Sequence, residues 1–216
     1  MLVASASFAV GWLRPAPRRR ATRITACEPS LGRAGRHLEA CGDALVAAAA
    51  VLGENQFQEE EPGSWSAAGC ALAISGRDFA EATAALADSN WEAATGPLAS
   101  AAAQLCIAAA STASHADASA AFEEAAAAVE DASSCTGCIS LAAAAGPSLA
   151  EGGAALQEAA KFVGEYGIGL ADIDRAGARG VAGQSIVRGA RELATAGKFV
   201  VLQGQGLESG QINLCE

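Results

Sequence analysis

Two cysteines, Cys135 and Cys138, have the spacing in this sequence that is best suited to chemistry. Such a pair can close a small disulfide or supply two ligands to a metal ion, and a helix N-terminus makes a thiol more acidic. Cys138 directly precedes a predicted helix, but no βαβ pattern surrounds the pair, no second pair exists, and His37 and His115 are far away in the sequence. We interpret the pair first as a structural disulfide or a free-thiol turn, with a redox pair and then a metal site as alternatives.

The other cysteines and the histidines form no recognisable catalytic motif. Cys41, Cys70 and Cys106 fall within predicted helices and are interpreted as small core residues. Neither histidine belongs to a nucleophile motif, and no G-x-S-x-G sequence occurs. Ser114 is predicted to cap a helix, with Asp117 three residues later in a capping box. We therefore predict no catalytic residue, no bound metal and no cofactor.

Two other features have an alternative interpretation as partner contacts. Glu59, Glu60 and Glu61 form an acidic run, which we interpret as a solvated loop, with contact to a basic partner as the alternative. Trp65 and Trp91 flank the second helical segment. Because only 5% of residues are aromatic, both tryptophans are interpreted as packing anchors, with exposed partner contacts as the alternative.

The composition indicates helices to position these residues. Alanine fills 57 of 216 positions, and it has the highest intrinsic helix propensity. Large apolar residues recur every seven positions, as at Leu72, Phe79 and Leu86, with Ala or Gly filling the rest of each face. Small residues at such positions let helix axes approach toward the lower end of the usual ~8–10 Å. We predict an all-α, alanine-rich antiparallel bundle of about four to six helices.

Turn signals divide the chain into segments. A basic N-terminal segment covers residues 1–30, the bundle residues 31–204 and a flexible tail residues 205–216. Gly167–Gly169 is predicted to be the turn before the last helix. The predicted helices are Leu31–Gly53, Ser66–Asp88, Trp91–Ala113, Ser114–Ala132, Ile139–Tyr166 and Leu170–Gln203.

No segment has the pattern of a transmembrane helix, which needs ~20 mostly apolar residues. The longest clean apolar run, Ala44–Leu52, is too short, and Leu98–Ala110 is interrupted by Ser100 and Gln104. The positive mean hydropathy of +0.24 comes from alanine, which is only weakly hydrophobic. We predict that the chain does not span a membrane.

The charge is unevenly distributed along the chain. Residues 1–27 hold five arginines and no acid, so the remainder carries −15, which together with this +5 gives the net −10. An acidic body repels nucleic acid and attracts basic protein surfaces. We therefore expect protein partners with basic surfaces and no nucleic-acid partner.

The N-terminal segment Met1–Ala26 is rich in Ala, Ser, Thr and Arg and contains no acid, which is typical of an organelle transit peptide. Ile24-Thr25-Ala26 before Cys27 is similar to a chloroplast processing site, and Ser5–Ala9 is similar to the junction used by plastids of red-algal ancestry. The alternatives are a mitochondrial presequence and a basic tail.

An acidic helical bundle with such a segment resembles, in overall type, the small extrinsic helical-bundle subunits of photosystem II and the accessory subunits of algal photosystems. The resemblance covers composition, length and the N-terminal segment. It implies a non-catalytic scaffold subunit associated with the thylakoid, leaves room for a peripheral pigment contact, and transfers no site residue. The alternatives are an accessory subunit of a mitochondrial membrane complex and a thiol-redox protein using Cys135 and Cys138.

Overall fold

The computed structural model describes residues 30–53, 65–88, 90–135 and 139–210. Over these residues it has six α-helices and no strand, and 91% of them are helical. The helices are α1 (Ser30–Leu52), α3 (Trp65–Ala87), α4 (Trp91–Ser111), α5 (Ala116–Ser134), α6 (Ile139–Ile173) and α7 (Ala178–Glu208). The predicted all-α bundle is therefore confirmed. The targeting-like segment lies outside the described residues, so its role stays a prediction.

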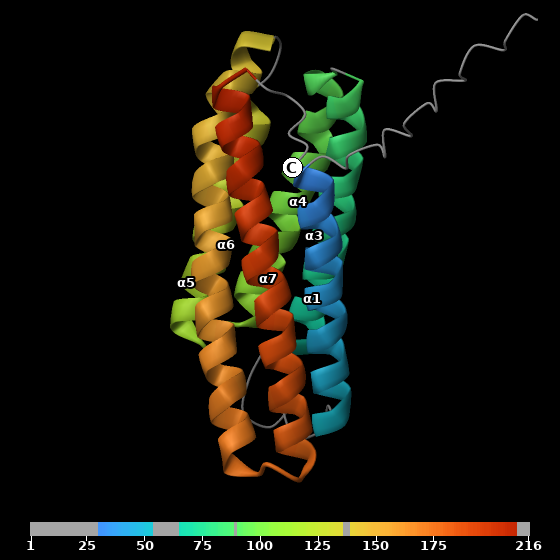
Figure 1. Ribbon diagram of the computed structural model, residues 1–216, viewed down its shortest axis with the longest axis vertical. Coiled ribbons are helices and arrows are strands. Elements are labelled where there is room, and N and C mark those ends of the chain that lie inside the picture. Colours follow the sequence, from blue (N-terminus) through green and yellow to red (C-terminus); the bar gives the residue numbers. More distant parts are fainter. Residues whose placement is uncertain (1–29, 54–64, 89, 136–138, 211–216) are drawn as a thin grey trace, which may run out of the picture.

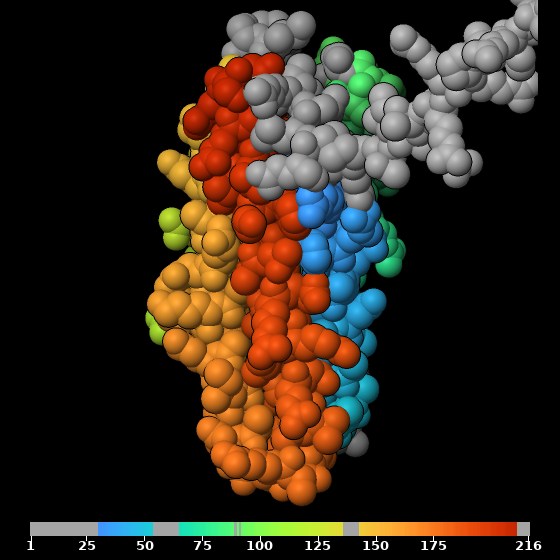
Figure 2. Space-filling view, in the orientation of Figure 1, coloured from blue at the N-terminus to red at the C-terminus, as the bar shows by residue number. Residues whose placement is uncertain are grey.

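The helices close into a ring. Consecutive helices run antiparallel side by side, and α7 returns to pack against α1. The ring is flattened into two layers, with α6, α7 and α1 in front and α5, α4 and α3 behind them (Figure 1). Figure 2 shows α6, α7 and α1 as one continuous front surface. The outer sides of α7 and α4 therefore face opposite directions.

Large apolar side chains fill the space between the layers, largely as the heptad spacing predicts. Leu72, Phe79 and Leu86 of α3 are all buried, and buried leucines of the other helices repeat this pattern. The helix predicted over Leu170–Gln203 is wrong at its start. Ile173 is the final residue of α6 and is 66% exposed, and Val187 is only half-buried on the outer side of α7.

Glycine pairs hold α6 and α7 close together. From one pair to the next, the position moves seven or fourteen residues forward along α6 and the same number back along α7. A Cβ atom on any of these glycines would lie 2.5–2.9 Å from the carbonyl oxygen of the glycine opposite, closer than real Cβ atoms pack. The pairs are Gly146–Gly204, Gly153–Gly197 and Gly167–Gly183.

The same arrangement joins α1 to α3. Gly35 lies against Gly76, and Gly42 lies against Gly69, again seven residues apart on both helices. Any side chain at these positions would overlap the opposite backbone. Two helix pairs of the ring are therefore in backbone contact, which agrees with the close approach expected from small seam residues.

Two predicted interruptions of the helices are wrong. Helix α6 continues through Gly167–Gly169 to Ile173, and the turn follows at Asp174–Gly177. Helix α7 continues to Glu208, beyond the predicted start of a flexible tail, and residues 211–216 lie outside the described part. Both errors treat glycine as a helix breaker, whereas Gly167 and Gly204 are helical contact positions.

Candidate functional site

Only one member of the predicted thiol pair is described. Cys135 follows the last residue of α5, is partly exposed, and its Sγ lies 3.6 Å from the carbonyl oxygen of Asp131. Cys138 lies outside the described residues, one position before α6 begins. The disulfide, redox and metal interpretations of this pair therefore stay predictions.

The helical cysteines differ from one another. Cys41 is fully buried in α1, as predicted, but Cys70 and Cys106 are exposed, so their assignment to the core is wrong. Both lie next to a residue that packs inward, Gly69 and Leu105, and the helical turn of about 100° per residue carries them to the solvent side. Whether a helical residue is buried depends on which face of the helix it occupies.

His37 belongs to a cluster that joins α1 to α7. Its Nδ1 lies 2.6 Å from Glu192 Oε2, and its ring stacks on Phe199 at 5.6 Å. The guanidinium of Arg33 lies 4.0 Å above the centre of the Phe199 ring. Cys41 follows one helical turn after His37, so a cysteine, a histidine and a glutamate lie near one another.

This cluster does not present a nucleophile. Cys41 is 0% exposed, and burial, with a smaller contribution from the Glu192 charge, raises its pKa from 9.0 to about 12. A protonated, enclosed thiol cannot attack a substrate. Among the described residues, no group of three or more His, Cys, Asp or Glu side chains is placed to hold a metal ion. What the cluster does provide is a contact between α1 and α7.

The second histidine lies in an aromatic cluster at one end of the bundle. His115, and not the predicted Ser114, is the N-cap residue of α5, and its side chain makes no capping hydrogen bond. Ring centres lie 5.2 Å apart for Trp65 and His115, 5.1 Å for Trp65 and Tyr166, and 4.3 Å for His115 and Tyr166. Trp65 is only 4% exposed, which agrees with its interpretation as a packing anchor.

The remaining candidates for partner contact are not placed. Trp91 is the first residue of α4, but its side chain is outside the described part of the structure. Glu59, Glu60 and Glu61 also lie outside the described residues. Their interpretations stay predictions, and any candidate contact surface must come from the described helices.

One such surface is the outer side of α4. No Asp, Glu, Lys or Arg occurs between Glu92 and Asp117. After Glu92 in its first turn, the exposed positions of this helix carry small or apolar side chains, and Ile107 is 47% exposed. We call this surface the α4 face, formed by Gly96, Ala99, Ala103, Cys106, Ile107 and Ala110.

By length and composition, α4 is also the one helix among those described that could cross a membrane, over Glu92–Ser111. This window contains Leu98–Ala110, where polar residues argued against a span. In the structure α4 packs between α3 and α5, and 39% of the window is buried inside the bundle. A helix of a protein core passes the same test, so this composition does not by itself place α4 in a bilayer.

The neighbouring helix α5 is strongly acidic. It carries five acidic side chains, and Lys and Arg are absent from it. All five are exposed, on a helix that packs directly against α4. These residues are Asp117, Glu123, Glu124, Glu130 and Asp131.

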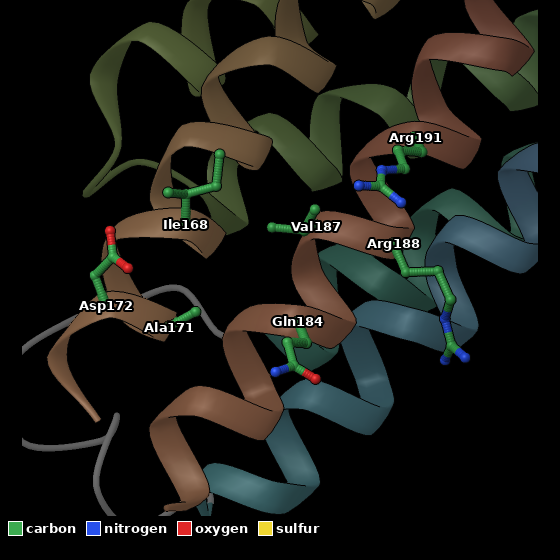
Figure 3. A pocket seen from close by; sticks show the side chains of 7 residues that line it. All are labelled: Ile168, Ala171, Asp172, Gln184, Val187, Arg188 and Arg191. Atoms are coloured by element: carbon green, nitrogen blue, oxygen red, sulfur yellow. The ribbon is translucent and has the colours of Figure 1, made fainter. Parts of the chain in front are cut away.

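A second surface lies on the opposite side of the bundle, between α6 and α7. Two adjoining hollows of about 270 and 300 Å³ share Ile168, Val187 and Arg191 as lining residues. Together they form what we call the α6/α7 groove, between Gln157–Asp172 of α6 and Gln184–Ala194 of α7. Ile168 and Val187 stand on facing walls, and Arg188 extends along the side of α7 that is farther from α6 (Figure 3).

Three basic residues lie on the groove side or the outer side of α7, and we call them the α7 cations. They are Arg188, Arg191 and Lys198. All three are exposed, and none has an ion-pair partner among the described residues. In contrast, Lys161 lies 2.9 Å from Glu158. The α7 cations thus leave positive charge available on a protein whose net charge is −10.

Comparison with protein-family models, with curated proteins and with solved structures finds no match to this chain.

Proposed function

We propose that this protein is a non-catalytic accessory or scaffold subunit that docks on a larger organellar complex. The observation that carries this proposal is the α4 face, a surface without charge on a helix open to solvent. Exposed apolar patches commonly mark interaction sites. Covering such a surface removes apolar area from water, which contributes about 25 cal/mol per Å² before the entropy cost of association is subtracted.

The surroundings of the α4 face support a protein partner of particular chemistry. The face itself offers no charge to pair, so the partner places an apolar strip against Ala103 and Ile107. The acids of α5 lie alongside, so basic residues next to that strip are attracted to them. A partner subunit with an apolar helix flanked by Lys or Arg satisfies both requirements.

The identity of the complex depends on the N-terminal segment. Its resemblance to a plastid transit peptide supports a photosystem–antenna assembly of an alga, on the thylakoid, as the first candidate. A mitochondrial membrane complex is the alternative, because a presequence of that organelle has similar composition. Both candidates make the protein a subunit of a larger assembly, so one fractionation experiment separates them.

The experiment is gentle solubilisation of the cell's membranes, separation by native size, and mass spectrometry of this chain and its mature N-terminus. Co-migration with a photosystem supports the proposal, and co-migration with a mitochondrial complex supports the alternative. A mature N-terminus near Cys27 supports removal of the basic segment. Migration of the chain alone, at 21.4 kDa or less, would contradict docking.

A pair of variants tests the α4 face itself. Ala103→Glu places a charge in the middle of the face and is expected to shift the protein from the complex to the free fraction. Ala40→Glu makes the same change at an exposed position of α1 and is expected to leave co-migration unchanged. Equal behaviour of the two variants rules out the α4 face as the contact.

A further inference from the structure

We infer that the α6/α7 groove, together with the α7 cations, is a second docking site that takes an acidic amphipathic helix of a partner protein. This site lies on the opposite side of the bundle from the α4 face (Figure 1). The inference therefore does not depend on the α4 contact. With both sites occupied, the protein would connect two partners across its own thickness.

The shape of the groove follows from the close seam between the two helices. Gly167 lies against Gly183, and small residues such as Gly164 and Ala194 line the hollow above the seam. A Cβ atom on Gly164 would meet only the Cβ of Ala190, at an ordinary 3.5 Å. The helix surfaces therefore curve away from each other and leave an open trough.

The length and lining of the groove suit a helix. It follows α6 from Gln157 to Asp172, which at 1.5 Å per residue is about 22 Å, or roughly four turns. Ile168 is 54% exposed, and it faces Val187 across the groove (Figure 3). On a docked helix, apolar side chains three or four residues apart lie on one face, so one of them can pack on Ile168 and the next on Val187.

The charge of the site selects an acidic helix. Arg191 lines both hollows, Arg188 lines one of them, and Lys198 lies about 10 Å farther along α7. An arginine guanidinium can donate two parallel hydrogen bonds to a carboxylate, so acidic residues on the polar side of the docked helix have partners available. Glu165 and Asp172 on the α6 side disfavour further carboxylates there, which orients the acidic side toward α7.

An anionic membrane is less well suited to this surface than a helix is. A bilayer is broad and flat, whereas the cations border a trough. Asp172 and Asp174 also lie at the α6 end of the same hairpin, where a flat anionic surface would meet them. Membrane binding is therefore an outcome that would contradict the inference.

The test uses the whole protein and two fluorescent peptides of about 15 residues. Both carry leucine at helical spacing, with glutamate at the polar positions of one and lysine in the other. The lysine peptide suits the α4 face instead, so any binding of it should be lost in Ala103→Glu. Fluorescence anisotropy at low salt is expected to show binding of the glutamate peptide both to the natural protein and to Ala103→Glu. Raising NaCl from about 50 to 300 mM should weaken that binding several-fold.

Variants identify the site on the protein. The double variant Arg188→Glu/Arg191→Glu is expected to weaken binding of the glutamate peptide at least about tenfold. Ile168→Glu, at an exposed wall position, should weaken it as well, while circular dichroism shows an intact fold. The double variant Arg36→Glu/Arg77→Glu makes the same change of charge on α1 and α3 and should leave binding unchanged.

Several results would overturn the inference. These are a loss of lysine-peptide binding in the Arg188/Arg191 variant equal to the loss of glutamate-peptide binding, an unchanged affinity of that variant for the glutamate peptide, or binding to vesicles with about 20% anionic lipid but not to the glutamate peptide. Ala103→Glu separates this inference from the proposed function, because it changes only the α4 face. That variant should keep its affinity for the glutamate peptide even when it no longer co-migrates with the complex.

Discussion

At the scale of the residue, the environment of each thiol decides its chemistry. Cys41 lies in the buried stripe of α1 and has a pKa raised to about 12, whereas Cys70 and Cys106 face solvent. The residue type is the same in all three cases. Whether a thiol is enclosed depends on which side of its helix meets a neighbour, and that is a property of the assembled bundle.

The buried thiol makes stability depend on pH. Because the pKa of Cys41 rises from 9.0 to about 12 on folding, its contribution is fully present below pH 9, where both states are protonated. Above pH 9 the unfolded chain loses the proton while the folded chain keeps it, so stability falls by ~1.4 kcal/mol per pH unit up to about pH 12. Urea unfolding of the natural protein and of Cys41→Ala, between pH 7 and 10.5, should show a shallower decline for the variant. Identical pH profiles would contradict the enclosure of this thiol.

At the scale of the element, glycine has a role opposite to the one its propensity suggests. Gly153 and Gly197 lie in mid-helix, where glycine costs about 1 kcal/mol relative to alanine. Their lack of a Cβ lets the backbones of α6 and α7 touch along the seam. The packing gained along the helix pair compensates for the poor propensity of each glycine.

Two glycines of α6 provide a matched comparison. Gly153→Ala places a Cβ 2.6 Å from both Gly197 O and Val201 N, so the helices must separate, and we expect a net loss of about 1–2 kcal/mol. Gly169→Ala meets nothing within 4 Å, so the gain in helix propensity should stabilise the protein by about 0.5–1 kcal/mol. Chemical unfolding of both variants measures the difference. A stabilising Gly153→Ala would show that the seam is looser than described.

The elements also show how far the sequence is informative. Heptad stripes such as Leu72, Phe79 and Leu86 predict the helices and their inner faces correctly, because that pattern is local. The turn predicted at Gly167–Gly169 is wrong. A glycine at a contact between two helices and a glycine that ends a helix cannot be told apart in the sequence until the opposite helix is known. The capping role of Ser114 is wrong for a similar reason, because the chain turns at His115, where the Trp65 and Tyr166 rings pack.

At the scale of the whole molecule, the net charge of −10 hides a separation of charge. The five acids of α5 lie in the rear layer, and the α7 cations lie in the front layer. Neither candidate surface is visible in the sequence. The α4 face requires knowing which side of α4 stays outside, and the α6/α7 groove requires two segments to be brought side by side.

The acidic side of the molecule should respond to salt. Raising NaCl from about 20 to 500 mM screens repulsion among the α5 carboxylates and should raise Tm by a few degrees. The double variant Glu123→Gln/Glu130→Gln should begin with a higher Tm and gain less from salt. Glu158→Gln is the control, because it removes a carboxylate that pairs with Lys161 and should not raise Tm. Equal salt responses of all three proteins would mean that α5 carries no net repulsion.

The reciprocal glycine pairs also restrict how the length of this protein can change during evolution. Inserting one residue within α6 ahead of Gly167 would rotate every later position by about 100° and bring the side chain of Tyr166 to the place where Gly167 now meets α7. The lengths of these two helices can therefore change only in steps of seven residues, made in α6 and α7 together. Related chains should differ in length by whole heptads, one added to α6 for each one added to α7, next to the turn between these helices. Insertions of other sizes should be confined to the connections between helices.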